Sequence, residues 1–155
     1  MGKRRLIGKI VILMLGLAAV VILAANSDTI PVSTPKKGYR VVIDPGHGGS
    51  DCGAVGVSGV KEAGLNLAVS LYLKEELEAL GMEAILTRSD ERALAEGKKA
   101  DMAARGKIMN GEGVDLVVSV HMNKFTDPSV HGPMAFYMKG SAEGEKLAKT
   151  VIDSI

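Results

Sequence analysis

The stretch YRVVIDPGHGG, residues 39–49, joins a short apolar run to a glycine-rich turn. The run Tyr39–Ile43 predicts a buried strand, which Asp44-Pro45-Gly46 ends. A second run, VDLVVSV at residues 114–120, is β-branched and apolar on both faces, and His121 follows it directly. Continuous apolar strands are typical of sheets that are covered on both faces. These two segments therefore predict the centre of such a sheet.

Segments with helical periodicity separate the predicted strands. Apolar residues between positions 65 and 80 recur at helical spacing, and Gly81 supplies a C-cap. Met82–Thr87 predicts another strand, and Lys98–Asn110 predicts a second, weaker helix. Strands that alternate with helices form right-handed βαβ units. The sequence therefore predicts a single three-layer α/β domain over residues 39–155, with a mostly parallel or mixed sheet between helices.

The C-terminal part of the sequence predicts two further elements. Pro133–Met138 could add a strand, and Ser141 begins a helix with an apolar stripe of Leu147, Val151 and Ile155. The sequence ends on that stripe, without the Gly or Asn that commonly caps a helix. An amphipathic helix normally buries its apolar face against a partner. We therefore expect the domain to be truncated at its C-terminus.

Residues 1–26 are interpreted as a membrane anchor or signal segment. Ile10–Ala25 is an uninterrupted run of sixteen residues that are apolar or Gly. With the residues before it, the run reaches the roughly 20 residues that span a bilayer as a helix. Cleavage at its end would place Leu23 at the −3 position, where a small residue is preferred, so an uncleaved transmembrane helix is favoured. Residues 27–38 then form a polar, proline-containing linker.

The basic residues before the apolar run predict the orientation of the chain. Lys3, Arg4, Arg5 and Lys9 would stay in the cytoplasm under the positive-inside rule. The chain would then be a single-pass protein of the cell membrane with its domain on the extracytoplasmic side. Cleavage of the segment would instead give a secreted domain.

Charge and cysteine content exclude a nucleic-acid site, an intrachain disulfide and a cysteine-based zinc site. The formal net charge is +1, but the residues after position 30 include 15 basic and 17 acidic side chains. That balance lacks the basic surplus that nucleic-acid binding requires. Cys52 is the single cysteine, so an intrachain disulfide and a cysteine-based zinc site are both excluded.

Two histidines follow the apolar strands at corresponding places. His47 lies four residues after Ile43, and His121 follows Val120 directly. In a parallel sheet both would emerge at the carboxyl edge, where open α/β sheets bind their ligands. Glu62 lies at the end of the loop that His47 begins, and it could fold back to the same edge. Two histidines and one carboxylate are the ligand set of a catalytic zinc site, with one position left for water.

Each of these residues also has a simpler interpretation. His47 could be an ordinary loop residue, His121 a hydrogen-bonded histidine at a strand end, and Glu62 an acid favoured by a helix dipole. His131, in a polar loop, is interpreted as solvated. Cys52 would place a thiolate in a hard site, which disfavours it as a ligand. Taken singly, the residues leave the metal site open.

Several segments in combination resemble one enzyme family. They are similar to motifs of the zinc-dependent N-acetylmuramoyl-L-alanine amidases (the Amidase_3 family) at Val41–Gly49 with Glu62, Thr87-Arg88-x-Asp90, Arg105–Asn110 and Ser119-x-His121-x-Asn123. The resemblance covers residues 39–155. Within the family, Ala95-Glu96-Gly97 and the Gly-Pro-Met-Ala-Phe-Tyr segment at 132–137 look closest to the sporulation amidases.

The resemblance implies a zinc ion held by His47, Glu62 and His121, and a peptidoglycan substrate. Zinc-activated water would cleave the amide bond between N-acetylmuramic acid and L-alanine, in cell-wall or spore-cortex remodelling. The family's general base is a Glu on a late strand, and we expect it beyond Ile155.

Three residues beside the implied ligands are candidates for supporting them through hydrogen bonds, namely Asp44, Ser119 and Asn123. Ordinary turn or strand-end hydrogen bonding is the simpler interpretation of each.

Three classes of function stay open. The first is the amidase. The second is a non-catalytic, zinc-dependent peptidoglycan-binding module left by loss of the catalytic Glu, and the third is a membrane-anchored partner protein with a vestigial pocket. A reading frame that continues past Ile155 to a Glu-x-Gly-Phe-like strand would favour the enzyme.

Overall fold

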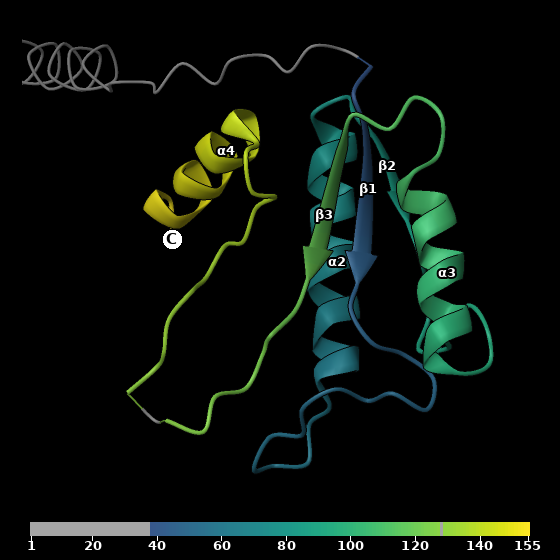
Figure 1. The fold of residues 1–155 in the computed structure, drawn as a ribbon, viewed down its shortest axis with the longest axis vertical. Coiled ribbons are helices and arrows are strands. Elements are labelled where there is room, and N and C mark those ends of the chain that lie inside the picture. The colour runs from purple at the N-terminus through teal and green to yellow at the C-terminus, as the bar shows by residue number, and fades with distance from the viewer. Residues whose placement is uncertain (1–37, 128) are drawn as a thin grey trace, which may run out of the picture. The chain divides into compact units, whose positions relative to one another are not determined.

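The computed structural model describes residues 38–127 and 129–155. The predicted anchor over residues 1–26, and nearly all of the predicted linker, lie outside these residues. Within the described part, no helix has the length and apolar character needed to cross a membrane. The elements in chain order are β1 (Arg40–Pro45), α2 (Glu62–Ala79), β2 (Glu83–Leu86), α3 (Lys98–Met109), β3 (Leu116–Val120) and α4 (Ala142–Asp153) (Figure 1).

The three strands form one parallel sheet in the order β2-β1-β3. Val42 of β1 pairs with Ile85 of β2 and with Val117 of β3. Helix α2 connects the neighbours β1 and β2, and α3 connects β2 to β3 on the other side of β1. Parallel strands need such crossover connections, because a tight hairpin cannot join them. Among the described residues the sheet is therefore parallel rather than mixed, and the alternation of strands and helices predicts this correctly.

Different helices cover the two faces of β1. Val41 and Ile43 belong to the buried core cluster, against which leucines of α2 pack. Successive strand residues point to opposite faces, so Asp44 points the other way, where Arg105 of α3 contacts it. Figure 1 shows α2 behind the strands. Helices on both faces give the three layers that the sequence predicts.

Strand β3 is less covered than the sequence predicts. Val117 is 39% exposed, whereas Val42, its neighbour on the same face of β1, is fully buried. Helix α3 packs against β1, and its cover does not extend over this face of β3. The prediction of a sheet covered on both sides therefore holds for β1 and is wrong for β3.

The segment from Pro133 to Met138 forms no strand, contrary to the prediction. Phe136 and Met138 are each 81% exposed, so their side chains cover no face of the sheet. Pro133 has no N–H to donate to a neighbouring strand, and a strand needs paired neighbours to be stable. The segment is an exposed connection between β3 and α4.

Helix α4 begins after Ser141, as predicted. The Ser141 hydroxyl accepts a hydrogen bond from the Gly144 N–H at 3.1 Å, which makes it an N-cap. No residue of α4 is buried, and Leu147 and Val151 of its apolar stripe are 40% and 42% exposed. Within the described residues the stripe therefore stays largely open to solvent.

Candidate metal centre

The carboxyl end of β1 leads into the loop that carries His47. Two buried arginines hold the backbone there, because Arg88 Nε and Arg105 Nη1 donate to the Pro45 carbonyl oxygen at 2.9 and 2.7 Å. Arg105 Nη2 also donates to the His47 carbonyl oxygen at 2.5 Å. His47 has a φ of 63°, in the left-handed region that few residues with a side chain adopt. The arginines therefore support a strained turn at the edge of the sheet.

Glu62 is the first residue of α2 and is only 6% exposed. Its N–H donates to the Ala54 carbonyl oxygen at 2.8 Å, and the Ala54 N–H donates to Glu62 Oε2 at 2.8 Å. The sequence predicts Glu62 just before the helix, whereas the structure places it in the first turn. Its carboxylate folds back to the carboxyl edge of the sheet, as the sequence predicts.

His121 follows β3 and reaches the same edge. Its Nδ1 lies 3.1 Å from Glu62 Oε1, and His47 Nε2 lies 3.3 Å from the same oxygen. The backbone N–H groups of Met122 and Asn123 also donate to this oxygen, at 3.2 and 3.3 Å. The Glu62 carboxylate therefore faces both imidazoles.

The distances from the Glu62 carboxylate to the two imidazoles fit a tetrahedral metal site. One ligand atom from each of His47, Glu62 and His121 lies within 4.8 Å of the others. The centroids of the two imidazole rings are 4.8 Å apart, and the ring planes make an angle of 80°. Metal–ligand bonds of about 2.0–2.1 Å in a tetrahedron separate neighbouring ligand atoms by roughly 3.3 Å. The two distances between imidazole nitrogens and the carboxylate fit this geometry.

Glu62 is ionised despite its burial. Burial by itself raises the pKa of a carboxyl group. Hydrogen bonds from the Ala54 N–H, from His121 and from the Asn123 N–H outweigh it and, with the nearby charge of His47, lower the pKa of Glu62 to about 2. The group is therefore an anionic donor beside two imidazoles, which suits a bound cation.

Two glycines lie directly against the candidate ligands. A Cβ atom on Gly46 would lie 2.2 Å from Cε1 of His121. A Cβ atom on Gly53 would lie 2.6 Å from Cδ2 of His47 and 2.8 Å from Oε2 of Glu62. Gly53 also has a φ of 66°, where a side chain is strained. The space beside these backbone atoms is therefore occupied by the ligand side chains.

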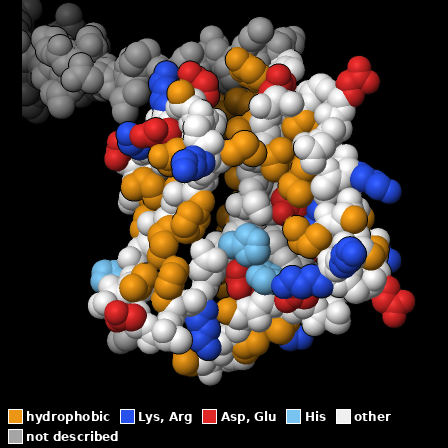
Figure 2. All heavy atoms as spheres, in the orientation of Figure 1, with side chains coloured by type: hydrophobic (Ala, Val, Ile, Leu, Met, Phe, Trp, Pro, Cys, Tyr) orange, Lys and Arg blue, Asp and Glu red, His pale blue; other side chains and the backbone are white. Residues whose placement is uncertain are grey.

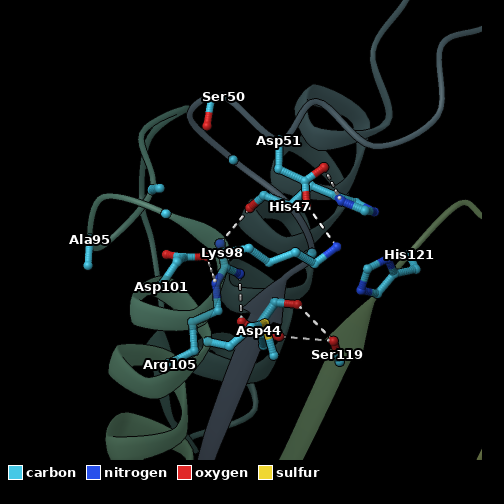
Figure 3. Close-up of a pocket in the computed structure, with 15 residues that line it drawn as sticks. Asp44, His47, Ser50, Asp51, Ala95, Lys98, Asp101, Arg105, Ser119 and His121 are labelled. Atoms are coloured by element: carbon cyan, nitrogen blue, oxygen red, sulfur yellow. Dashed lines mark hydrogen bonds and ion pairs between the residues drawn. The ribbon is translucent and has the colours of Figure 1, made fainter.

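A cavity of about 270 Å³ lies beside the two histidines. Its walls come from the ends of β1 and β3, the loop after β1 and the first turn of α3, with Asp51, Lys98 and Asp101 among its charged groups (Figure 3). Figure 2 shows histidine side chains on the surface of this face, next to acidic and basic ones. A polar molecule can therefore reach the candidate ligands.

Asp44 and Ser119, which the sequence predicts as supporting residues, both line this cavity. Asp44 accepts hydrogen bonds from the side chains of Thr87, Arg105 and Ser119 at 2.6, 2.9 and 3.0 Å. These bonds connect the end of β1 to the residue after β2, to α3 and to β3. The two residues thus hold together the elements that carry the ligands.

Asn123 lies beside the candidate ligands, whereas His131 and Cys52 lie outside the ligand cluster. Asn123 contacts the candidate ligand Glu62 through its backbone N–H. His131 is exposed, in agreement with its interpretation as solvated. Cys52 lies outside the ligand cluster, and its thiol donates to the Gly53 carbonyl oxygen at 3.4 Å.

Some residues that shape the site are not predicted from the sequence. The carboxylate of Asp51 contacts His47. The sequence signal for this contact is an acidic residue four positions after a candidate ligand. Arg88 and Arg105 enter only as parts of family-like motifs, and the sequence gives no indication that they bind the backbone of the ligand loop.

Comparison with known proteins identifies the family. The family model described as N-acetylmuramoyl-L-alanine amidase, Amidase_3, matches residues 41–155. The chain belongs to this family. The family resemblance read from the sequence motifs is therefore confirmed.

Curated relatives support the same assignment. The germination-specific N-acetylmuramoyl-L-alanine amidase of Bacillus subtilis is 34% identical over 138 residues, which cover 84% of this chain and 58% of the relative. The amidase AmiA of Escherichia coli is 33% identical over 126 residues, which cover 81% of this chain and 42% of the relative. The chain therefore spans about half the length of these relatives.

Solved structures show the same fold. The CwlD amidase from Clostridioides difficile, determined in complex with the GerS lipoprotein, gives a TM-score of 0.68 at 29% identity and covers 74% of this chain and 64% of its own. The catalytic domain of CwlV from Bacillus (Paenibacillus) polymyxa gives 0.64 at 29% identity, over 75% and 64%. CwlD and the germination-specific relative agree with the predicted likeness to sporulation amidases.

Proposed function

We propose that this chain carries the metal-binding part of a hydrolase that cleaves the amide bond between N-acetylmuramic acid and L-alanine in peptidoglycan. The observation that carries the proposal is the convergence of His47, Glu62 and His121 at the carboxyl edge of a parallel sheet. Membership of the amidase family supports the scissile bond and the substrate class.

Zinc is the metal that these donors fit best. Two imidazoles and one carboxylate with an open fourth position are a donor set of catalytic zinc sites. A zinc ion held there would supply a water activated near neutral pH and would polarise a carbonyl oxygen. The protein's own part is to hold the donors, and Glu62 adds the negative charge that its hydrogen bonds keep ionised.

Among the described residues, three carboxylates line the cavity, those of Asp44, Asp51 and Asp101. Each is engaged in an ion pair with another side chain. Asp44 and Asp101 bind Arg105, and Asp51 binds His47. None is therefore a free general base. We propose that a Glu beyond Ile155 serves in the whole enzyme, taking a proton from water and donating one to the leaving nitrogen. The present chain would then be slow or inactive.

The same engaged carboxylates favour a second candidate, a zinc-dependent peptidoglycan-binding module without catalysis. Such a module would use the metal centre to hold the glycopeptide. Retention on purified peptidoglycan that requires zinc, with no release of L-alanine amino termini, would support this candidate over the hydrolase.

Metal analysis tests the proposed centre. The full chain of 155 residues, purified in mild detergent, should hold about one zinc ion, and His121→Ala should hold much less. His131→Ala changes an exposed histidine outside the cluster, and as the matched control it should retain zinc. Equal zinc in the wild type and in His121→Ala would refute the ligand set.

We also propose that residues 1–26 anchor the chain in the cell membrane and leave the domain on the extracytoplasmic side. The basic cluster ahead of the apolar run supports this orientation, and the peptidoglycan substrate lies on that side. Protease added to intact spheroplasts should digest the domain, whereas full protection would contradict the orientation. Release of the domain into the medium would indicate signal cleavage instead.

The germination-specific relative supports a role in spore-cortex remodelling.

A further inference from the structure

The loop after β1 folds Asp51 back over His47. The Gly48 N–H donates to the Asp51 carbonyl oxygen at 2.8 Å, and the Asp51 N–H donates to the Gly48 carbonyl oxygen at 3.1 Å. Gly49, inside this turn, has a φ of 61°, which glycine adopts without strain. The Asp51 side chain thereby reaches the imidazole four residues before it (Figure 3).

The two ring nitrogens of His47 have different neighbours. Nδ1 lies 3.0 Å from Oδ1 of Asp51, and Nε2 lies 3.3 Å from Oε1 of Glu62. A neutral imidazole carries its proton on one nitrogen and offers the lone pair of the other to a metal. A proton held on Nδ1 by Asp51 would therefore leave the Nε2 lone pair directed toward the other candidate ligands.

Lys98 of α3 contacts the second oxygen of Asp51. Its Nζ lies 3.5 Å from Oδ2, and its side chain is 79% exposed. An exposed ion pair contributes little energy, but this one comes from a different element than the ligand loop. Figure 3 shows Lys98, Asp51 and His47 close together at the cavity. The Asp51 carboxylate thus has His47 at one oxygen and Lys98 at the other.

We propose that Asp51 is a positioning residue of the metal centre, which fixes the ring and the tautomer of His47 so that Nε2 faces the metal. The inference rests on the proposed metal-dependent function and adds a residue to that site. Metal-binding histidines generally donate their second N–H to a carboxylate, a carbonyl or water, and loss of that partner typically weakens metal binding about 10–100-fold.

Asp51 also supports the loop itself, and the two roles must be separated. Its Oδ1 accepts a hydrogen bond from the Gly53 N–H at 3.1 Å, which forms an Asx turn. Asp90 forms the same kind of turn by accepting from the Arg92 N–H at 2.9 Å, and it lies outside the ligand cluster. Asp90→Ala is therefore a matched control for the loss of an Asx turn.

The experiment uses the full chain in detergent as wild type, Asp51→Ala, Asp51→Asn and Asp90→Ala. Competition with a chromophoric chelator gives the zinc dissociation constant, and thermal unfolding gives the melting midpoint of each metal-free protein. Asp51→Ala should bind zinc about 10–100-fold more weakly than the wild type. Asp51→Asn keeps an acceptor oxygen and should lose less zinc affinity than Asp51→Ala. Asp90→Ala should bind zinc like the wild type. The metal-free melting midpoints of Asp51→Ala and Asp90→Ala should fall by similar small amounts.

Equal zinc affinity in Asp51→Ala and Asp90→Ala would overturn the positioning role and leave the metal centre intact. A wild-type chain that binds no zinc would refute the metal centre itself, and the positioning role with it. If Asp51→Ala does not fold, Asp51→Asn decides the question. If Asp51→Asn binds zinc more weakly than Asp90→Ala, the positioning role is supported. If the two variants bind zinc equally, the role is overturned.

Discussion

At the scale of single residues, the two oxygens of Glu62 have separate partners. Oε2 accepts a hydrogen bond from the Ala54 N–H, within the loop that precedes α2. Oε1 faces both imidazoles and the two backbone N–H groups that follow β3. One oxygen thus fixes the carboxylate to its own loop while the other points toward the histidines. This division suits a ligand that binds a metal through one oxygen.

The lowered pKa of Glu62 predicts an acid-dependent part of the stability of the metal-free chain. The pKa falls from 4.5 to about 2 in the folded protein, so ionisation of Glu62 favours the folded state. This contribution is fully present above a pH of about 4.5 and is lost as the pH falls through about 2. At neutral pH it is on the order of 3 kcal/mol, because one pKa unit corresponds to about 1.4 kcal/mol.

Urea unfolding of the metal-free wild type and of Glu62→Gln, from about pH 6 to about pH 2.5, measures this contribution. The free energy of unfolding of the wild type should fall more steeply with decreasing pH than that of the variant. Glu76→Gln, at an exposed position of the same helix, corrects for the change in net charge. Parallel pH profiles of the wild type and Glu62→Gln would contradict the lowered pKa.

A methyl group at Gly46 should displace His121, because the new Cβ would lie 2.2 Å from its ring. We expect Gly46→Ala to lose about 1–3 kcal/mol of stability through overpacking and to bind zinc more weakly. A Cβ atom on Gly64 in α2 would meet no atom within 4 Å outside the backbone of its own helix. Gly64→Ala should therefore gain up to about 1 kcal/mol of stability from helix propensity. Thermal unfolding and chelator competition test both variants. Unchanged zinc affinity in Gly46→Ala would show that the imidazole position is not required.

The sequence pattern suggests that the three candidate ligands meet because each lies at the end of an element with a clear pattern, and the family resemblance implies that they bind zinc. His47 and His121 follow apolar strands, and Glu62 precedes a helical periodicity. Asp51 is different, since its contact with His47 depends on a turn that residue types alone do not specify. The buried arginines are harder still, because arginine is almost never fully buried unless it is paired. Their carbonyl and carboxylate partners become visible only in the folded structure.

At the scale of elements, Arg105 connects α3 to the end of β1 and to the ligand loop. It donates to the carboxylates of Asp44 and Asp101 and to the carbonyl oxygens of Pro45 and His47. A buried charge is costly unless such partners satisfy it. Its donors are spread over both carboxylates and the loop backbone, so α3 and the loop are held in one arrangement.

Loss of Arg105 should therefore be strongly destabilising. Arg105→Met leaves Asp44 buried without its cation, and breaking a buried pair typically costs about 3–5 kcal/mol. Arg92→Met removes an exposed pair with Asp90 and should cost at most about 1 kcal/mol. Denaturant unfolding of both variants makes the comparison. A similar small loss in both would mean that the buried network rearranges or admits water.

The elements themselves are predictable where local periodicity decides them. The strand predicted at Tyr39–Ile43 forms at Arg40–Pro45, and the helix predicted at Lys98–Asn110 forms at Lys98–Met109. The errors arise where tertiary contacts decide. Residues 133–138 have an apolar composition but pair with no strand, and the open face of β3 depends on how far α3 reaches over the sheet.

At the scale of the whole molecule, the described residues combine an open polar edge with exposed apolar side chains. Leu147, Val151 and Ile155 are 40%, 42% and 80% exposed, and Figure 2 shows apolar side chains grouped on the same view as the histidines. Exposed apolar groups of this kind promote association. Catalytic rates must therefore be compared per folded, zinc-loaded chain.

The engaged carboxylates of the cavity predict that this chain hydrolyses peptidoglycan slowly. A chimera that continues past Ile155 with the remaining segment of the Bacillus subtilis germination-specific relative should be about 10²–10⁴-fold faster, which is the usual contribution of a general acid–base residue. That range corresponds to roughly 3–5 kcal/mol of activation free energy. Release of L-alanine amino termini from purified peptidoglycan measures both rates.

Normalisation to bound zinc and to folded protein separates a missing proton donor from a misfolded domain. A chain that folds and binds zinc but turns over slowly lacks something other than its metal ligands. Replacing the Glu residues of the added segment one at a time should return the chimera to the slow rate at a single position. Comparable normalised rates for chain and chimera would instead place the base within residues 39–155. Glu83, Glu91, Glu96 and Glu112 are the candidates that would then be tested by substitution.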